Sequence, residues 1–134
     1  MTGNGIKVFV YGTLLPGQPN RHIIKDHIKE AEIGAIAGRL VDCGHYPAVV
    51  RDGSKTLVKG QWVTVDRLGL AAMDELEEYY GMEENNDYCR VWVRDAVRTH
   101  IGGWVYIWED DRGCPTIGSG YWPEYNKDKK EKQS

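Results

Sequence analysis

The chain has few of the features that mark metal sites or disulfide frameworks. Its 134 residues include three cysteines, Cys43, Cys89 and Cys114, which are widely spaced and form no C-x-x-C pair. Such cysteines indicate neither a disulfide framework nor a zinc site, so we expect reduced thiols. The four histidines are scattered, and none has H-E-x-x-H spacing. We therefore expect no metal and no cofactor.

Long apolar runs and excess positive charge are absent too. No apolar run approaches the roughly 20 residues that span a bilayer, and the first residues lack the pattern of a signal peptide. A net charge of −3 and a pI near 5.8 give no positive field for nucleic acid or anionic lipid. We expect a cytoplasmic protein that acts on a small molecule, without nucleic-acid or membrane partners, as a monomer or weak homodimer.

What is present describes a folded domain. The composition is 41% hydrophobic and 28% charged, with Trp 5 and Tyr 8 against a single Phe, a balance typical of globular chains. The length is enough for one domain with a real core. We expect that domain over residues 1–125 and a charged, disordered tail over residues 126–134.

Alternating and β-branched stretches predict about six strands. They lie at residues 6–11, from residue 31 as a bent stretch interrupted by glycines, and at residues 46–50, 56–65, 88–97 and 104–108. Two helices are predicted, one after an N-cap at Asn20 and running through Ile28, the other over residues 67–80. Strands and helices do not alternate regularly, which favours an α+β fold around a curved or partly closed sheet. Periodicity alone does not decide between a barrel and an open sheet.

One acidic side chain falls on the apolar face of the second predicted helix. At about 100° per residue, that face carries Leu70, Met73, Leu76 and Tyr80, and Glu77 lies between Leu70 and Met73. A carboxylate in apolar surroundings has a raised pKa, as a general base at neutral pH requires. In the alternative, Glu77 lies at the edge of the core with its carboxylate in water or paired with Arg90 or Arg94.

The first strand ends in a glycine-containing turn, Tyr11-Gly12-Thr13-Leu14. Successive backbone N–H groups in such a turn can point outward and bind a carboxylate or an oxyanion. Gly12 allows close approach of a ligand. A plain turn is the alternative interpretation. The segment lacks the Gly-Lys-Ser/Thr ending of a Walker loop, so nucleotide binding has little support.

Six blocks in a fixed order resemble a known family. They are VFVYGTLLPGQPN (8–20), GRL with CGHYPAV (38–40 and 43–49), VKGQWV (58–63), MDELE (73–77), YCRVWV (88–93) and IGSGYW (117–122). In these blocks the chain resembles the γ-glutamylcyclotransferase-like proteins, which include γ-glutamylamine cyclotransferase and the plant AIG2-like proteins. The resemblance covers residues 6 to 122.

This resemblance implies a fold, an activity and a site. The fold is a mixed, barrel-like sheet with two flanking helices. The activity is cyclisation of a γ-glutamyl group by its own α-amine, which releases 5-oxoproline and a free amine. The family's acid/base glutamate maps onto Glu77, in agreement with the helical face, and the loop from Tyr11 to Leu14 forms a wall of the cavity. Tyr88 lines the pocket by family analogy, with cross-strand packing as the alternative.

Departures from the family pattern concern the substrate. Glu78 stands where many members have glycine, the linker over residues 79–87 is long, Tyr121 replaces an acidic residue, and Asn20-Arg21-His22 replaces an Asn-His pair. Arg90 could pair with an acid or face solvent, and we favour the solvent-facing position. We expect Trp122 to cover the core.

Two other classes of function remain open at this point. One is a non-catalytic protein of the same fold that binds a small carboxylate. The other is a hydrolase that uses Cys43 or Cys114 as nucleophile with one of the histidines, although no nucleophile motif surrounds either cysteine. The sequence does not identify the γ-glutamyl compound or the pathway.

Overall fold

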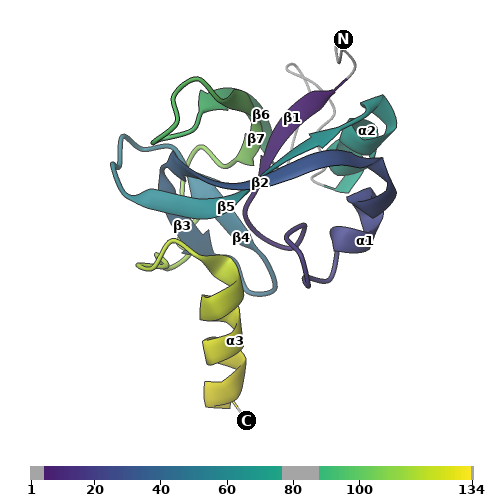
Figure 1. The fold of residues 1–134 in the computed structure, drawn as a ribbon. Helices are drawn as coiled ribbons and strands as arrows, with labels where there is room; N and C mark the ends of the chain where they lie inside the picture. Colours follow the sequence, from purple (N-terminus) through teal and green to yellow (C-terminus); the bar gives the residue numbers. More distant parts are fainter. Residues whose placement is uncertain (1–4, 77–87, 134) are drawn as a thin grey trace.

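The computed structural model describes residues 5–76 and 88–133 of the chain, and its centre is a five-stranded mixed sheet (Figure 1). The strand order is β2-β5-β1-β7-β6, and a separate two-stranded sheet pairs β3 with β4. Neighbours in the large sheet are antiparallel except β1 and β7, which are parallel. The strands are β1 (Ile6–Val10), β2 (Ile28–Ala37), β3 (Arg39–Asp42), β4 (Pro47–Val50), β5 (Leu57–Val65), β6 (Cys89–Arg94) and β7 (Gly102–Ile107). The predicted α+β class with a mixed sheet is confirmed, with one strand more than expected because the bent stretch divides at Gly38 into β2 and β3.

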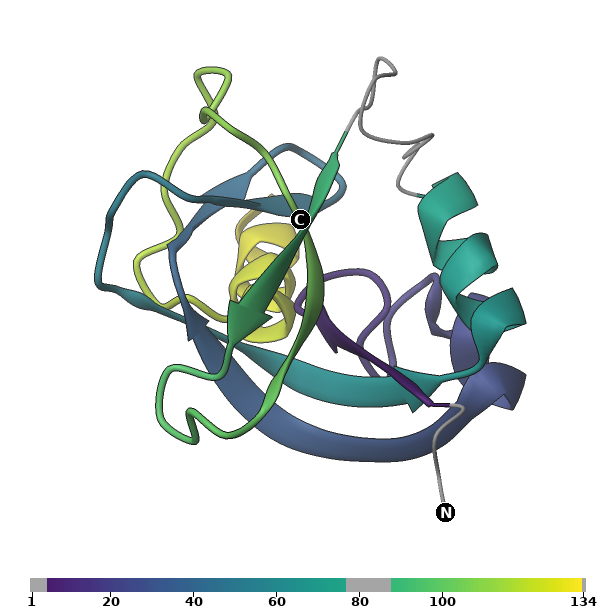
Figure 2. The same cartoon turned by 90° about the horizontal axis from the view of Figure 1, so that it is seen from above.

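The large sheet curves strongly, as the view from above shows (Figure 2), and the turn after β6 comes back to β2 at the other edge. The turn after β6 binds β2 at Ala35. The Ala35 N–H donates to Asp95 Oδ2 at 3.0 Å, and the Ala35 carbonyl accepts from the Ala96 N–H at 2.8 Å. Asp95 is only 2% exposed. Trp62 also donates its indole N–H to the Asp95 carboxylate, at 2.9 Å. These bonds join the two edges and give the sheet its barrel-like form.

The β3–β4 hairpin is attached to the end of β7. Trp108 donates its backbone N–H to the Val49 carbonyl at 2.9 Å, which continues the direction of β7 beside β4. Strand β3 in turn pairs with the segment near Thr116, where the Ile117 N–H donates to the Leu40 carbonyl at 2.7 Å. The hairpin therefore places the turn before Pro47 close to the end of β1.

Two helical segments lie side by side at one flank of the sheet (Figure 1). The predicted first helix is shorter than expected: α1 spans Arg21–Ile24, a 3-10 turn follows over Lys25–His27, and Ile28 already begins β2. Helix α2 spans Arg67–Leu76 and begins after Asp66, whose Oδ1 accepts the Gly69 N–H at 2.8 Å as an N-cap does. The rest of the predicted helix, residues 77–80, lies outside the described residues.

A third helix replaces most of the predicted disordered tail. Helix α3 spans Trp122–Gln133 and extends away from the sheet (Figure 1). Its sequence is polar and lacks the apolar periodicity that predicts a helix, but contacts with the rest of the fold hold the helix in place. Tyr125 donates its hydroxyl to Asp42 Oδ2 at 2.8 Å, and Lys129 Nζ lies 3.2 Å from Asp42 Oδ1. Trp122 at its start is fully buried, as expected of a residue that covers the core.

Aromatic and β-branched side chains fill the interior in two groups. Phe9 and Trp62 meet edge to face with ring centroids 5.1 Å apart in a cluster that also contains Trp122. The predicted alternation of β6 is confirmed, since Cys89, Val91 and Val93 pack on this cluster. No helix in residues 5–76 and 88–133 is long and apolar enough to cross a membrane.

Candidate active site

The loop after β1 forms one wall of a cavity. The loop is closed on itself, since the Leu15 N–H donates to the Gly12 carbonyl at 3.1 Å and the Asn20 N–H to the Thr13 carbonyl at 2.9 Å. A Cβ atom on Gly12 would lie 2.7 Å from Cγ of Pro47. Glycine at this position therefore lets the loop approach the turn before β4.

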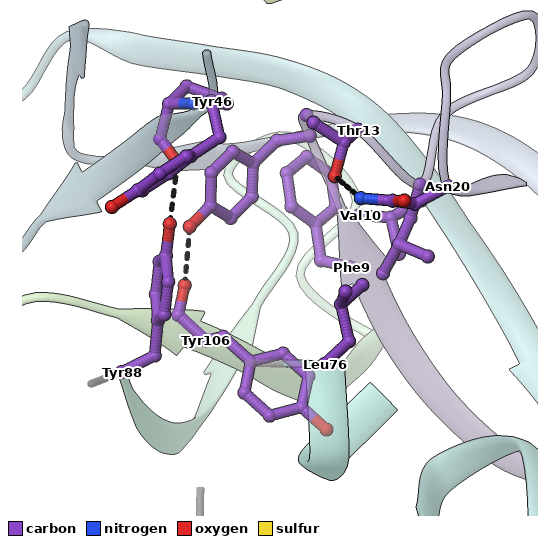
Figure 3. A pocket seen from close by; sticks show the side chains of 12 residues that line it. Phe9, Val10, Thr13, Asn20, Tyr46, Leu76, Tyr88 and Tyr106 are labelled. Atoms are coloured by element: carbon purple, nitrogen blue, oxygen red, sulfur yellow. Dashed lines mark hydrogen bonds between the residues drawn. The ribbon is translucent and has the colours of Figure 1, made fainter. Parts of the chain in front are cut away.

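The cavity has a volume of about 240 Å³ and draws its wall from both helical and strand elements. Figure 3 shows Thr13 and Asn20 at the top of the view, with Tyr88 and Tyr106 below them. Its lining residues are Phe9, Val10, Tyr11, Gly12, Thr13, Leu14, Asn20, Tyr46, Pro47, Leu76, Tyr88 and Tyr106. The cavity thus contains all five predicted substrate-binding residues, Tyr11, Gly12, Thr13, Leu14 and Tyr88; that they bind substrate stays a prediction.

The loop offers hydrogen-bond donors to this space. Within the described residues, the backbone N–H groups of Gly12, Thr13 and Leu14 have no acceptor. The Thr13 hydroxyl oxygen accepts a hydrogen bond from Asn20 Nδ2 at 2.9 Å (Figure 3), so its own proton remains for another acceptor. Three amides and one hydroxyl can therefore meet an anionic group.

Two of the lining tyrosines tie parts of the wall together. Tyr11 donates its hydroxyl to the Tyr106 carbonyl at 2.6 Å, and Tyr88 donates to the Pro47 carbonyl at 3.0 Å (Figure 3). The Tyr88 ring also packs 5.7 Å from Trp108, centroid to centroid. Tyr88 therefore lines the cavity and also packs on an aromatic ring at the end of β7, and its contact with substrate stays a prediction.

A partly buried ionic group holds the end of α2 against β6 and β7. Arg90 Nη1 lies 2.8 Å and 2.7 Å from the two carboxylate oxygens of Asp74, and Tyr106 donates its hydroxyl to Asp74 Oδ1 at 2.5 Å. The expectation that Arg90 faces solvent is wrong: its side chain is 19% exposed and lies over the Trp104 ring. Burial raises the pKa of Tyr106 well above its usual range, and the Asp74 carboxylate adds to the rise.

Sequence reasoning missed Asp74, although a signal was present. Asp74 follows Leu70 by four residues, so it lies near the apolar face of the same helix. Glu77, the predicted acid/base, lies outside the described residues, and its role is untested by the geometry. Its chain neighbour Leu76 lines the cavity.

The two cysteines considered as hydrolase nucleophiles are not part of the cavity wall. The cavity wall described above contains neither Cys43 nor Cys114. Burial, followed by the neighbouring Cys114 thiol, raises the pKa of Cys43, which is opposite to what an activated nucleophile needs. Within the described part of the chain, no group of three or more His, Cys, Asp or Glu side chains could hold a metal.

Comparison with known families assigns the chain. A family model described as gamma-glutamyl cyclotransferase, AIG2-like, matches residues 8–124, and the chain belongs to this family. Among its relatives, gamma-L-glutamyl-butirosin B gamma-glutamyl cyclotransferase of Niallia circulans is 35% identical over 122 residues, covering 88% of this chain and 76% of the relative. The gamma-glutamylcyclotransferase family protein YtfP of Escherichia coli K12 is 28% identical over 124 residues, 91% of this chain and 100% of the relative.

Solved structures share the fold. YkqA from Bacillus subtilis superposes with a TM-score of 0.73 at 23% identity; the match covers 95% of this chain and 43% of YkqA, so the chain spans less than half of that protein. A mouse AIG2-like protein gives a TM-score of 0.64 at 24% identity, with 92% and 83% coverage. At these identities the likeness shows the fold alone.

Proposed function

We propose that the chain is a γ-glutamyl cyclotransferase that releases 5-oxoproline and a free amine from a γ-glutamyl amide, with Glu77 as the residue that moves the proton. One observation carries the proposal: the donor loop over residues 12–14 and Leu76, the chain neighbour of Glu77, line the same cavity. The cavity of about 240 Å³ is smaller than the roughly 300–1,000 Å³ common for drug-sized ligands. Its size suits a small acyl group.

The reaction needs little more than positioning and one proton carrier. The α-ammonium group of the substrate loses a proton to the Glu77 carboxylate, and the resulting amine attacks the γ-carbonyl carbon. The C–N bond of the ring forms, and the carbonyl electrons move onto oxygen. When that oxyanion collapses, the bond to the departing nitrogen breaks and Glu77 returns its proton to the amine. The ring nitrogen gives up its second proton to the same amine, which leaves as an ammonium group, and 5-oxoproline keeps a single N–H.

The donor loop supplies what the negative charges require. The oxyanion and the α-carboxylate of the substrate both need hydrogen-bond donors, and the N–H groups of Gly12, Thr13 and Leu14 are available. None of the described lining residues carries a formal charge. The α-carboxylate is therefore held by neutral donors, with the Thr13 hydroxyl as one of them.

Support for the substrate class comes from a relative rather than from the cavity. The Niallia circulans protein is named for its action on gamma-L-glutamyl-butirosin B, which supports an amide of γ-glutamate as the substrate class here. The acyl half is selected by the cavity described above. The amine half projects beyond the space that a γ-glutamyl group fills.

The test is release of 5-oxoproline from a panel of substrates. The purified chain is incubated with γ-glutamyl amines, γ-glutamyl amino acids and γ-glutamyl-ε-lysine, and 5-oxoproline is quantified by mass spectrometry. Glu77→Gln is expected to lower kcat by at least about 100-fold, since loss of a general acid/base costs about 10²–10⁴-fold. Glu75→Gln, on the exposed side of α2, is the matched control and should keep wild-type turnover.

The binding-protein alternative makes a different prediction. A chain that binds one compound of the panel by calorimetry, yet releases no 5-oxoproline from any of them, is a small-carboxylate-binding protein of this fold. Full turnover by Glu77→Gln would instead remove Glu77 from the mechanism and leave the reaction intact.

A further inference from the structure

Outside the cavity, a short antiparallel ladder joins β3 to the segment that precedes α3. Val41 lies opposite Thr116, and the Asp42 N–H donates to the Pro115 carbonyl at 2.8 Å. The hydrogen bonds flank the Val41–Thr116 pair rather than join its two residues. Such a pair is of the type in which opposite side chains are closest, with Cα atoms about 4.5 Å apart.

The same register brings two cysteines together. If the register of the Val41–Thr116 bridge is carried two residues farther along both segments, Cys43 falls opposite Cys114, at a position of the closely spaced type. That spacing lies within the roughly 4.4–6.8 Å between Cα atoms that a disulfide bridges. Both side chains are partly buried against the same hydrophobic cluster, and the neighbouring Cys114 thiol is one of the causes that raise the pKa of Cys43.

We propose that Cys43 and Cys114 are a site of reversible oxidation, at which a small-molecule disulfide converts the two thiols into an intramolecular disulfide bond. One cysteine thiolate attacks a sulfur of the small disulfide, whose S–S bond breaks and releases one small thiol. The second cysteine thiolate then attacks the protein sulfur of the mixed disulfide and releases the other small thiol. Two electrons pass from the cysteine pair to the small molecule, and each thiol that leaves takes up one proton.

The third cysteine has different surroundings. Cys89 lies on β6, where its Sγ is 3.9 Å from Glu109 Oε1. Burial, followed by the Glu109 carboxylate, raises the pKa of Cys89. In the described residues no thiol faces it, so Cys89 serves as the matched control for the pair.

The oxidised bond would restrain the wall of the cavity. Cys43 donates its N–H to the Tyr46 carbonyl at 2.9 Å and so closes the turn that leads to Pro47. Both Tyr46 and Pro47 line the cavity. A bond from Cys43 to Cys114 therefore fixes this turn to the segment before α3, across a long stretch of sequence.

The test uses 2-hydroxyethyl disulfide, which carries no γ-glutamyl group and is therefore no candidate substrate. The reduced protein is incubated with it at pH 8, where thiolates are more abundant, and free thiols are then alkylated. We expect an intact mass lower by two hydrogens before alkylation, one alkylated cysteine instead of the three of the reduced protein after it, a Cys43–Cys114 cross-linked peptide after digestion, and reversal by dithiothreitol. The Cys89→Ser variant should behave in the same way, whereas Cys43→Ser and Cys114→Ser should form no intramolecular bond.

Two physical readouts accompany the mass measurement, and neither depends on turnover. Oxidation should raise Tm by several degrees, because the bond restrains the unfolded chain over a long loop, and it should slow amide hydrogen exchange in the turn over residues 43–46. Both effects should be absent in Cys43→Ser. A stable mixed disulfide on the wild type, a bond to Cys89, or an oxidised form whose turn exchanges as fast as the reduced one would overturn the proposal.

Discussion

Thr13 is the residue whose side chain most directly tests how the cavity holds an anion. Its hydroxyl oxygen accepts from Asn20 Nδ2 at 2.9 Å, which directs its proton elsewhere. Thr13→Val should raise KM for a γ-glutamyl substrate about 10-fold and leave kcat nearly unchanged, because a contact to the α-carboxylate is made in ground state and transition state alike. Steady-state kinetics of 5-oxoproline release measure both constants, and Thr13→Ser, which keeps the hydroxyl, is the control. A fall in kcat at constant KM would place this hydroxyl at the oxyanion instead.

The sequence predicts some residues of the site and misses others. The loop from Tyr11 to Leu14 could be predicted because a strand that ends in glycine leaves amides unpaired, and no acceptor among the described residues meets the N–H groups of residues 12–14. Asp74 could not be paired from sequence, because its partners Arg90 and Tyr106 come from strands far along the chain. Helical position predicts which side a residue faces, whereas the partner depends on how the strands stack beside the helix.

At the scale of elements, the turn between β6 and β7 depends on one carboxylate. Burial of Asp95 opposes its ionisation, but the N–H groups of Arg98, Trp62, Ala35 and Val97 outweigh that effect and hold its pKa at about 2. Its ordinary value is 3.8. A lowered pKa means that the carboxylate stabilises the fold above about pH 4, and that this contribution disappears as pH falls toward 2.

The corresponding prediction concerns Asp95→Asn. The substitution should lower the free energy of unfolding at pH 7 by about 1–3 kcal/mol. The side-chain NH2 group of asparagine would face the N–H donors from which the Asp95 carboxylate accepts, so some of these hydrogen bonds would be lost. Urea unfolding at pH 7 and again near pH 2 measures this, and the difference from wild type should shrink at the lower pH. Asp128→Asn, on the exposed side of α3, should match wild type throughout. An equal loss at both pH values would mean that side-chain shape, not charge, matters at Asp95.

Elements with a strong period were predicted well, and those that depend on distant contacts were not. The alternation in β6 and the β-branched run of β1 predict strands because each has one face to bury. Helix α3 has no such face over most of its length; Tyr125 and Lys129 hold it through Asp42, some 80 residues away in sequence. The short α1 was predicted too long, because Ile28 satisfies a strand pairing with Val65 rather than another helical turn.

For the whole molecule, α3 is linked to the rest of the fold through one partly buried acid. The Asp42 side chain is 10% exposed and lies 3.2 Å from Lys129 Nζ, which also donates to the Gly44 carbonyl at 2.7 Å. Lys129→Ala should therefore lower the free energy of unfolding by about 1–3 kcal/mol, as loss of hydrogen bonds to a charged group does. Chemical denaturation checks this against Lys130→Ala, which alters an exposed lysine one residue away. Equal stabilities of the two variants would show that Trp122 and Tyr125 alone hold the helix.

The bonds between Asp95 and Ala35 have a consequence for behaviour in concentrated solution. An open strand edge offers its amides and carbonyls to a strand of another molecule, and aggregation by strand addition begins there. On β2 these groups are occupied at Ala35, and the edge before it carries the charged side chains of Lys29, Glu30 and Glu32. The contacts at Ala35 and the charged side chains thus protect the β2 edge from pairing with a strand of another molecule. Solutions of the Asp95→Asn variant should become turbid at concentrations at which the wild type stays clear.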